Sequence, residues 1–149
     1  MTKEILLSIR GLQITPDSQS ETIETISPGE YYFRNGKHFF VYEEVMEGLQ
    51  EITRNIIKVS DDYMELTKKG TVNIHMLFER NKKNVTYYYT PFGSLMIGID
   101  AYRVEFHETE NEMIIDVEYA LDVNNEHMSN CHIRIQVNPR EDGRFKLMK

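Results

Sequence analysis

A strict alternation of apolar and polar side chains constrains this chain more than any other feature. In the run 113–123 every odd position is apolar, and three of the five even positions carry a carboxylate. Successive side chains on a strand point to opposite faces, so this run predicts one β-strand with a core face and a solvent face. The alternation recurs along most of the chain, separated by turn signals such as Asn35-Gly36. Consecutive strands joined by tight turns predict an all-β fold, a single antiparallel up-and-down β-barrel of about 8–10 strands.

Three local patterns predict where strands bend or turn. Apolar side chains change parity at Gly11, within Lys3–Thr15, which predicts a β-bulge. The residues from Pro16 to Ser18 predict a turn. Pro28-Gly29 predicts a bend between two short strands.

The segment 41–59 supports two different predictions. Its apolar residues recur at helical spacing, and its glutamates would suit the exposed side of a helix. Gly48 in the middle and the β-branched run 56–59 favour strands instead. From the residues alone, helix and strand both stay open here.

Composition bounds the class of protein. A chain of 149 residues fits one domain with a core of its own. Its formal charge of −7 argues against nucleic acid and anionic membranes as partners. A lone cysteine, Cys131, cannot form an internal disulfide, and no stretch resembles a signal peptide or a membrane span. We therefore predict a cytoplasmic protein with one barrel domain over residues 1–138. Residues 139–149 lack the alternation and are expected to form a poorly ordered tail.

Several strands and turns of this chain also match those of a known family. The segments that carry the match are Tyr42–Glu44, Gly48-Leu49, Tyr87–Ser94 and Glu118–Leu121, with turns at Lys69-Gly70 and Asn124–Glu126 in the expected order. Over roughly Glu4 to Val137 the chain resembles the YwiB-like family of uncharacterised bacterial proteins. That family is similar to the calycins, the closed barrels of lipocalins and fatty-acid-binding proteins. The resemblance therefore implies a calycin-like barrel, with strands over 41–59.

The resemblance does not extend to a ligand. The chain has no tryptophan, so the Gly-x-Trp signature of secreted lipocalins is absent. The Arg-x-Tyr carboxylate clamp of fatty-acid-binding proteins has no counterpart near Arg134. At Lys69 the family more often has arginine, whose bidentate contact with an anion lysine does not reproduce. What the resemblance implies is a barrel of unknown function.

No motif for catalysis or metal binding stands out. On an extended strand Cys131 and His132 point to opposite faces, so they do not share a metal ion. The chain contains no nucleophile elbow, no glycine-rich phosphate loop and no His-Glu-x-x-His. Adjacent carboxylates such as Asp61 and Asp62 do not form an acid–base pair on one face. We therefore expect no metal, no cofactor and no enzymatic activity.

Polar groups on otherwise apolar strand faces are the remaining candidates for function. Arg54 lies between Ile52 and Ile56, and Glu44 follows Phe40 and Tyr42 on one face. Charges that face into a barrel are costly unless they are paired or meet a ligand, and a structural ion pair is the commoner reason. Tyrosines suit a pocket wall because they join an apolar ring to a hydroxyl. The candidate ligand-binding residues are Tyr42, Glu44, Arg54, Tyr87, Tyr89 and Tyr119.

Three functions follow, in order of preference. The first is a non-enzymatic cytoplasmic barrel that binds a small, largely apolar molecule, with the tyrosines lining the cavity and Arg54 or Glu44 orienting a polar end. The second is a structural or protein-interaction module with a filled barrel, which associates with itself as a homodimer. The third is an enzyme of a type that its sequence does not reveal. The eight methionines suit both of the first two functions.

Overall fold

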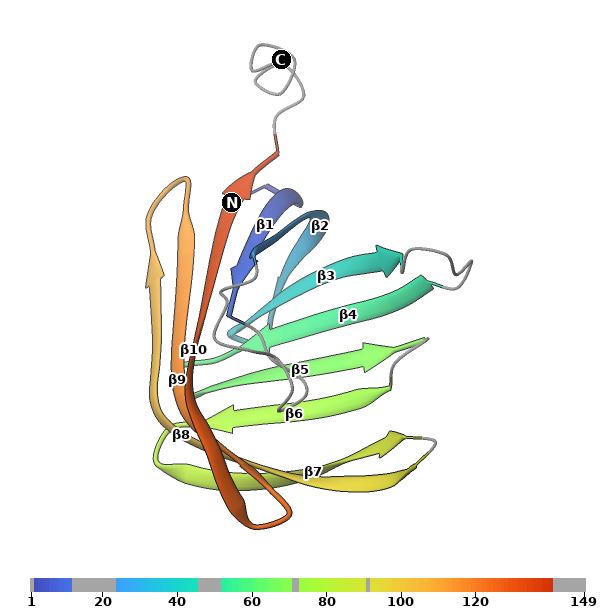
Figure 1. The fold of residues 1–149 in the computed structure, drawn as a ribbon. Helices are drawn as coiled ribbons and strands as arrows, with labels where there is room; N and C mark the ends of the chain where they lie inside the picture. Colours follow the sequence, from blue (N-terminus) through green and yellow to red (C-terminus); the bar gives the residue numbers. More distant parts are fainter. Residues whose placement is uncertain (1, 12–23, 46–51, 71–72, 91, 141–149) are drawn as a thin grey trace.

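The computed structural model describes residues 2–11, 24–45, 52–70, 73–90 and 92–140. These residues form ten antiparallel strands in one sheet that curves into a nearly closed barrel (Figure 1). No helix in this part of the chain is long and apolar enough to cross a membrane. The strands are β1 (Glu4–Arg10), β2 (Glu24–Arg34), β3 (Lys37–Val45), β4 (Ile52–Val59), β5 (Tyr63–Lys69), β6 (Ile74–Glu79), β7 (Lys82–Thr90), β8 (Gly93–Glu108), β9 (Met113–Val123) and β10 (Glu126–Pro139).

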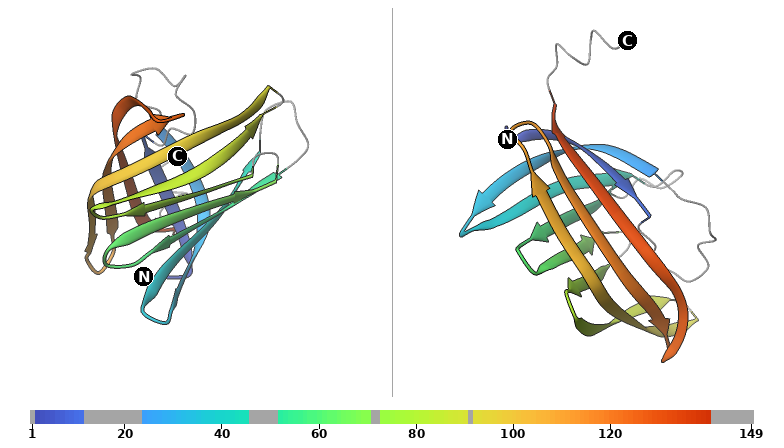
Figure 2. Two further views of the ribbon diagram at one scale, coloured as in Figure 1. Left: turned by 90° about the horizontal axis from the view of Figure 1, so that it is seen from below. Right: turned by 90° about the vertical axis from the view of Figure 1, so that its left-hand side faces the viewer.

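The strands follow one another around the barrel in chain order, as predicted for an up-and-down topology. The order in the sheet is β6-β5-β4-β3-β2-β1-β10-β9-β8-β7, so β1 pairs with β10 and brings the two ends of the described chain together. Strands β6 and β7 are consecutive in sequence but are the two edges of this sheet. We call the line between them the seam. Two further views show the curvature of the sheet (Figure 2).

The predicted alternation and turns are confirmed where they were most regular. The run 113–123 is β9, and its odd positions from Met113 to Leu121 are all buried. At the β2–β3 turn Asn35 and Gly36 have φ of 53° and 74°, as a type I′ hairpin requires. Asn124 and Asn125 at the β9–β10 turn also have positive φ. Asparagine and glycine are the residues that adopt this left-handed backbone most readily.

The bend predicted at Pro28-Gly29 is not a break between two strands. β2 is continuous from Glu24 to Arg34, but its partner changes along its length. Residues 24–30 pair with β1, whereas residues 29–34 pair with β3. A Cβ atom on Gly29 would lie 2.7 Å from the Val41 carbonyl oxygen and 2.8 Å from Leu7 Cδ1, so a side chain does not fit where β2 pairs with both β1 and β3.

The other local predictions have mixed outcomes. Gly11 follows the end of β1 and has a φ of 78°, but residues 12–15, which would show a bulge, lie outside the described residues. Register shifts occur instead at Tyr102 in β8 and at Met128 in β10. The helical alternative for 41–59 is wrong for the residues that are described, because β3 runs to Val45 and β4 begins at Ile52. The turn at Pro16–Ser18, the segment 46–51 and residues 141–149 of the predicted tail also lie outside the described residues. Pro139, the first residue of the predicted tail 139–149, is the last residue of β10.

The core lies inside the barrel. Inward-facing aliphatic and aromatic side chains from eight of the strands are buried there, and Tyr31 of β2 and Tyr88 of β7 pack against them. The buried rings of Phe78 on β6 and Tyr119 on β9 meet edge to face, with centroids 5.0 Å apart. Full burial of a large apolar side chain contributes about 1.5–3 kcal/mol relative to exposure, so this face fixes the register of the barrel.

Candidate functional site

Polar side chains interrupt the apolar inner face of β3, β4 and β5. Tyr42 lies opposite Asn55, and Asn55 lies opposite Lys68, so the three form one row across the strands. All three are almost fully buried, with exposures of 3%, 0% and 4%. Glu44 is one inward position further along β3, towards the end of the strand, and lies opposite the buried Thr53. Three adjacent strands, β3, β4 and β5, thus bring polar groups to one place inside the barrel.

Glu44, Asn55 and Lys68 form a hydrogen-bonded group that we call the Glu44 cluster. Lys68 Nζ donates to Glu44 Oε1 at 2.6 Å, and Asn55 Nδ2 donates to the same oxygen at 2.8 Å. The Lys68 side chain is 5% exposed and that of Glu44 is 36% exposed, so the ion pair extends from the interior to solvent. Asn55 Oδ1 is buried and has no hydrogen-bond donor within reach among the described residues. Burial, and then the negative charge of Glu44, raise the pKa of Tyr42, which therefore stays neutral.

A groove of about 470 Å³ lies along the seam and meets this cluster at Lys68, while Glu44 and Asn55 do not line it. It is lined from outward-facing positions of β5, β6 and β7 and from the inward-facing positions Lys68, Ile74 and Thr86. We call it the seam groove. Its size falls within the range usual for small-molecule sites, about 300–1,000 Å³. The full lining is Thr67, Lys68, Lys69, Asn73, Ile74, His75, Val85, Thr86, Tyr87 and Tyr89.

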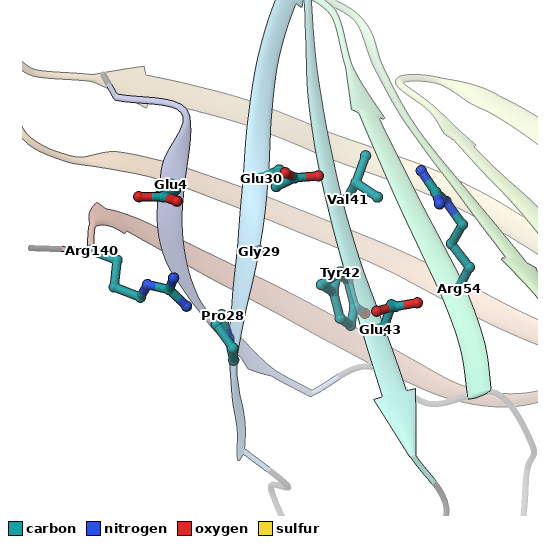
Figure 3. Close-up of a pocket in the computed structure, with 9 residues that line it drawn as sticks. All are labelled: Glu4, Pro28, Gly29, Glu30, Val41, Tyr42, Glu43, Arg54 and Arg140. Atoms are coloured by element: carbon teal, nitrogen blue, oxygen red, sulfur yellow. The ribbon is translucent and has the colours of Figure 1, made fainter. Parts of the chain in front are cut away.

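A second groove, of about 450 Å³, lies where β2 turns from β1 to β3 (Figure 3). Charged side chains dominate its walls, and Arg54 and Arg140 lie at opposite sides of it. Tyr42 also lines this groove, beside the glycine at which β2 changes partner. The residues that line it are Glu4, Pro28, Gly29, Glu30, Val41, Tyr42, Glu43, Arg54 and Arg140. With both signs of charge and little apolar wall, it suits an apolar ligand less well than the seam groove.

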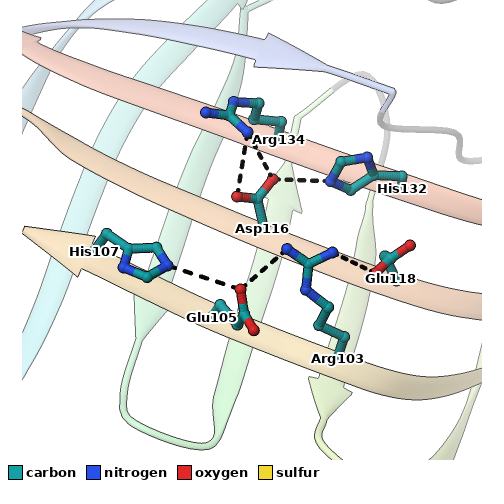
Figure 4. Close-up of polar contacts among 7 residues, drawn as sticks. All are labelled: Arg103, Glu105, His107, Asp116, Glu118, His132 and Arg134. Atoms are coloured by element: carbon teal, nitrogen blue, oxygen red, sulfur yellow. Dashed lines mark hydrogen bonds and ion pairs between the residues drawn. The ribbon is translucent and has the colours of Figure 1, made fainter.

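A network of charges covers the outer face of β8, β9 and β10 (Figure 4). Asp116 faces outward, yet its side chain is only 6% exposed because residues of β10 cover it. It accepts hydrogen bonds from His132 Nε2 at 2.8 Å and from Arg134 Nη1 at 3.4 Å. Arg103 donates to Glu105 at 3.0 Å and lowers the pKa of that carboxyl group. The Asp116 contacts cross from β9 to β10, and the Arg103–Glu118 pair crosses from β8 to β9. Such cross-strand pairs of opposite charge stabilise neighbouring strands.

Cys131 and His132, the two residues weighed as metal ligands, are neighbours on β10. Cys131 is buried and faces inward, whereas His132 faces outward and contacts Asp116. The two side chains are therefore on opposite faces, as the alternation predicts. Among the described residues no three histidine, cysteine, aspartate or glutamate side chains come together as metal ligands would.

The structure separates the six predicted ligand residues. Tyr42, Glu44 and Tyr119 face inward, and Tyr42 and Glu44 lie together while Tyr119 packs on Phe78. Tyr87 and Tyr89 face outward on β7, where they are 52% and 76% exposed and line the seam groove. The prediction that these two tyrosines line the inside of the barrel is therefore wrong.

The prediction that Arg54 faces into the barrel is also wrong. Arg54 is exposed and lies opposite Glu43 on the outer face, because the inward positions of β4 are the odd ones. Both faces of β4 carry apolar residues, so the sequence does not reveal which face is buried. For the same reason Asn55, which is on the buried face of β4, was not predicted as a site residue. Lys68 was also missed, although its spacing from Met64 and Leu66 continues the buried face of β5.

Ten antiparallel strands in a nearly closed up-and-down barrel, with polar groups inside, define a small barrel protein. The model of the family described as "Domain of unknown function (DUF1934)" matches residues 7–135, and the chain belongs to this family. Its fold is similar to the structure titled "Crystal structure of ywiB protein from Bacillus subtilis", with a TM-score of 0.73, 20% identity and 93% of each chain covered. No curated protein matches the chain. The predicted YwiB-like family and the predicted barrel are therefore confirmed.

Proposed function

We propose that the barrel is a non-enzymatic, cytoplasmic binding protein for a small, largely apolar molecule. In this proposal the apolar part of the ligand lies in the seam groove, and its polar end meets the Glu44 cluster. The observation that carries the proposal is the position of Lys68. It is a buried lysine that belongs both to the Glu44 cluster and to the lining of the seam groove.

The energetic cost of the Glu44 cluster supports a role in binding. Removing a lysine and a carboxylate from water is expensive, and well-packed apolar residues often replace a buried ion pair without loss of stability. In this barrel the inner positions next to the pair carry ordinary core residues such as Leu66 and Ile57. A buried charged pair that lies beside a groove is a candidate binding site.

The walls of the seam groove suit a ligand with an apolar body. Ile74, Val85, Tyr87 and Tyr89 offer aliphatic and aromatic surface, and no ladder of hydrogen bonds joins β6 to β7. The two strands can therefore separate slightly without breaking backbone pairs between them. Tyrosine side chains also give large contact area at a small cost in conformational entropy.

Binding can be tested first without knowing the ligand. Mass spectrometry of the purified protein, under native and then denaturing conditions, detects a co-purified molecule as extra mass that denaturation removes. We also expect the neutral dye Nile red to bind the native protein. Because both side chains are exposed, the double variant Tyr87→Ser/Tyr89→Ser should fold and should bind the dye about tenfold more weakly.

Tyr102→Ser is the matched control, since Tyr102 is 49% exposed, close to the 52% of Tyr87, but lies outside the seam groove. It should bind the dye as the wild type does. Equal affinity of the double variant and the wild type would contradict the proposal.

A second function, self-association through β7, is favoured by a different observation. Val85, Tyr87, Tyr89 and Phe92 are large side chains that are at least half exposed, and they lie on or next to an edge strand. Exposed apolar groups at an edge strand favour pairing with another chain. Analytical ultracentrifugation separates the two functions. A dimer that the double variant Tyr87→Ser/Tyr89→Ser dissociates would support the interaction module, and a monomer would contradict it.

A further inference from the structure

We propose that the polar end of the ligand is a hydroxyl group, and thus that the ligand is a neutral apolar alcohol. This inference rests on the proposed function. It comes from counting the hydrogen-bond donors, acceptors and charges of the Glu44 cluster that the described residues leave unpaired.

The orientation of the Asn55 amide is fixed by its neighbour. Carboxylate oxygens only accept hydrogen bonds, so the amide group 2.8 Å from Glu44 Oε1 must be the Nδ2 donor. The Oδ1 acceptor therefore points away from Glu44. It is fully buried, and no donor of the described residues reaches it. A buried acceptor without a donor is unfavourable, and a ligand with an O–H or N–H group relieves this cost.

Lys68 supplies the complementary donors. Its ammonium group has three N–H bonds, and Glu44 Oε1 is the acceptor that the structure gives it. Lys68 lies directly opposite Asn55, on the strand nearer to the seam. Asn55 and Lys68 are therefore neighbours on the inner face, one with an acceptor and the other with donors that no described residue pairs. A single hydroxyl group can donate to Asn55 Oδ1 and accept from Lys68 Nζ at the same time.

The charge balance of the cluster disfavours an ionised ligand. Glu44 and Lys68 cancel each other, and Tyr42 is held neutral by burial. A ligand carboxylate would place a second anion beside Glu44, and a ligand ammonium would place a second cation beside Lys68. Like charges repel strongly where little water screens them. A hydroxyl group leaves the balance unchanged.

Three probes of equal chain length test the inference on the wild-type protein: 1-octanol, octanoate and octylamine, each used to displace Nile red. We expect 1-octanol to displace the dye at a concentration about tenfold lower than either ionised probe. If octanoate or octylamine displaces the dye at the lower concentration, the inference is wrong although the proposed function stands. If the dye does not bind, or none of the probes displaces it, the proposed function fails as well.

A variant tests the role of Asn55 directly. Methyl octyl ether accepts a hydrogen bond but cannot donate one, so wild type should prefer 1-octanol to the ether by about fivefold. Asn55→Leu should remove this preference, whereas Asn130→Leu, at an exposed asparagine on β10, should keep it. An unchanged preference in Asn55→Leu would overturn the assignment. If that variant does not fold, the comparison of alcohol with ether on wild type still decides, because equal displacement contradicts a donated hydrogen bond.

Discussion

At the scale of single residues, burial decides which polar groups matter. Lys68 and Lys69 are neighbours in sequence, yet Lys68 is buried and bonded to Glu44 while Lys69 is exposed. The difference follows from the alternation of β5, which turns one lysine inward and the other outward. Composition counts these lysines as equal, but their energetic roles differ.

We expect Lys68→Met to lower the free energy of unfolding by about 1–3 kcal/mol, because it leaves the Glu44 carboxylate without its cation. Lys69→Met should change it by less than about 0.5 kcal/mol. The double variant Glu44→Gln/Lys68→Met should recover part of the loss, since it removes both charges. Urea unfolding measures all three, and equal effects of the two single substitutions would contradict the structural role of Lys68.

His38 offers a residue-scale test that depends on pH. His38 is on β3 and faces inward. Its Nδ1 lies 2.8 Å from the hydroxyl of Tyr31 on β2, and its ring centroid lies 4.5 Å from that of Phe106 on β8. Burial lowers the pKa of His38, while the negative charges of Glu108 and Asp61 partly oppose this. The folded state therefore favours neutral His38 more than the unfolded state does.

The stabilisation from neutral His38 is present above the unfolded pKa of about 6.5 and is lost as pH falls through the lower folded pKa. Wild type should thus lose more stability than His38→Phe when the pH is lowered from about 7.5 to about 5. Urea unfolding at both pH values measures the difference. His107→Phe, at an exposed histidine, should behave like wild type. The same pH dependence in His38→Phe and wild type would show that His38 does not contribute.

At the scale of elements, strands with one apolar face were predictable and strands with two were not. β9 was predicted with its bounds, because its odd positions are apolar and its even positions carry three carboxylates. β4 has apolar residues on both faces, so the prediction of its buried face was wrong, and with it the predicted position of Arg54. β2 was divided at Pro28-Gly29, because a proline and a glycine usually end a strand. Here they mark a change of partner instead.

The outer network of β8, β9 and β10 predicts different effects for two acids on one strand. Asp116→Asn should lower the free energy of unfolding by about 1–3 kcal/mol, since buried Asp116 accepts from His132 and Arg134. Glu118→Gln should cost no more than about 1 kcal/mol, because the Arg103–Glu118 pair is partly exposed. Thermal or urea unfolding checks the order, and a larger cost for Glu118→Gln would contradict it.

At the scale of the whole molecule, the seam is the weak line of the barrel. Every other strand boundary carries a ladder of backbone hydrogen bonds, whereas none joins β6 to β7 among the described residues. Edge strands open locally at lower free energy than central strands. The proposed site therefore lies where the wall can move most easily, which suits a ligand whose polar end must reach the buried Lys68.

Amide hydrogen exchange tests this property of the whole sheet. Peptides from β6 and β7 should exchange faster than peptides from β9, which is paired on both sides. Bound 1-octanol should slow exchange in β6 and β7 if the ligand bridges the seam. Protection of β7 equal to that of β9 in the free protein would contradict an open seam.

The sequence by itself determined the fold class, most of the strands and the positive-φ turns, because the alternation and the preferences of asparagine and glycine act locally. It also determined that Phe40, Tyr42 and Glu44 share a face. Only the tertiary structure decided which face of β4 is buried and that β6 and β7 do not pair with each other. It also decided that Glu44, Asn55 and Lys68 meet. These features depend on pairing between strands far apart in sequence and on the closure of the sheet. No local pattern encodes that closure, since the alternation of side chains in a strand is the same whether or not a neighbouring strand pairs with it.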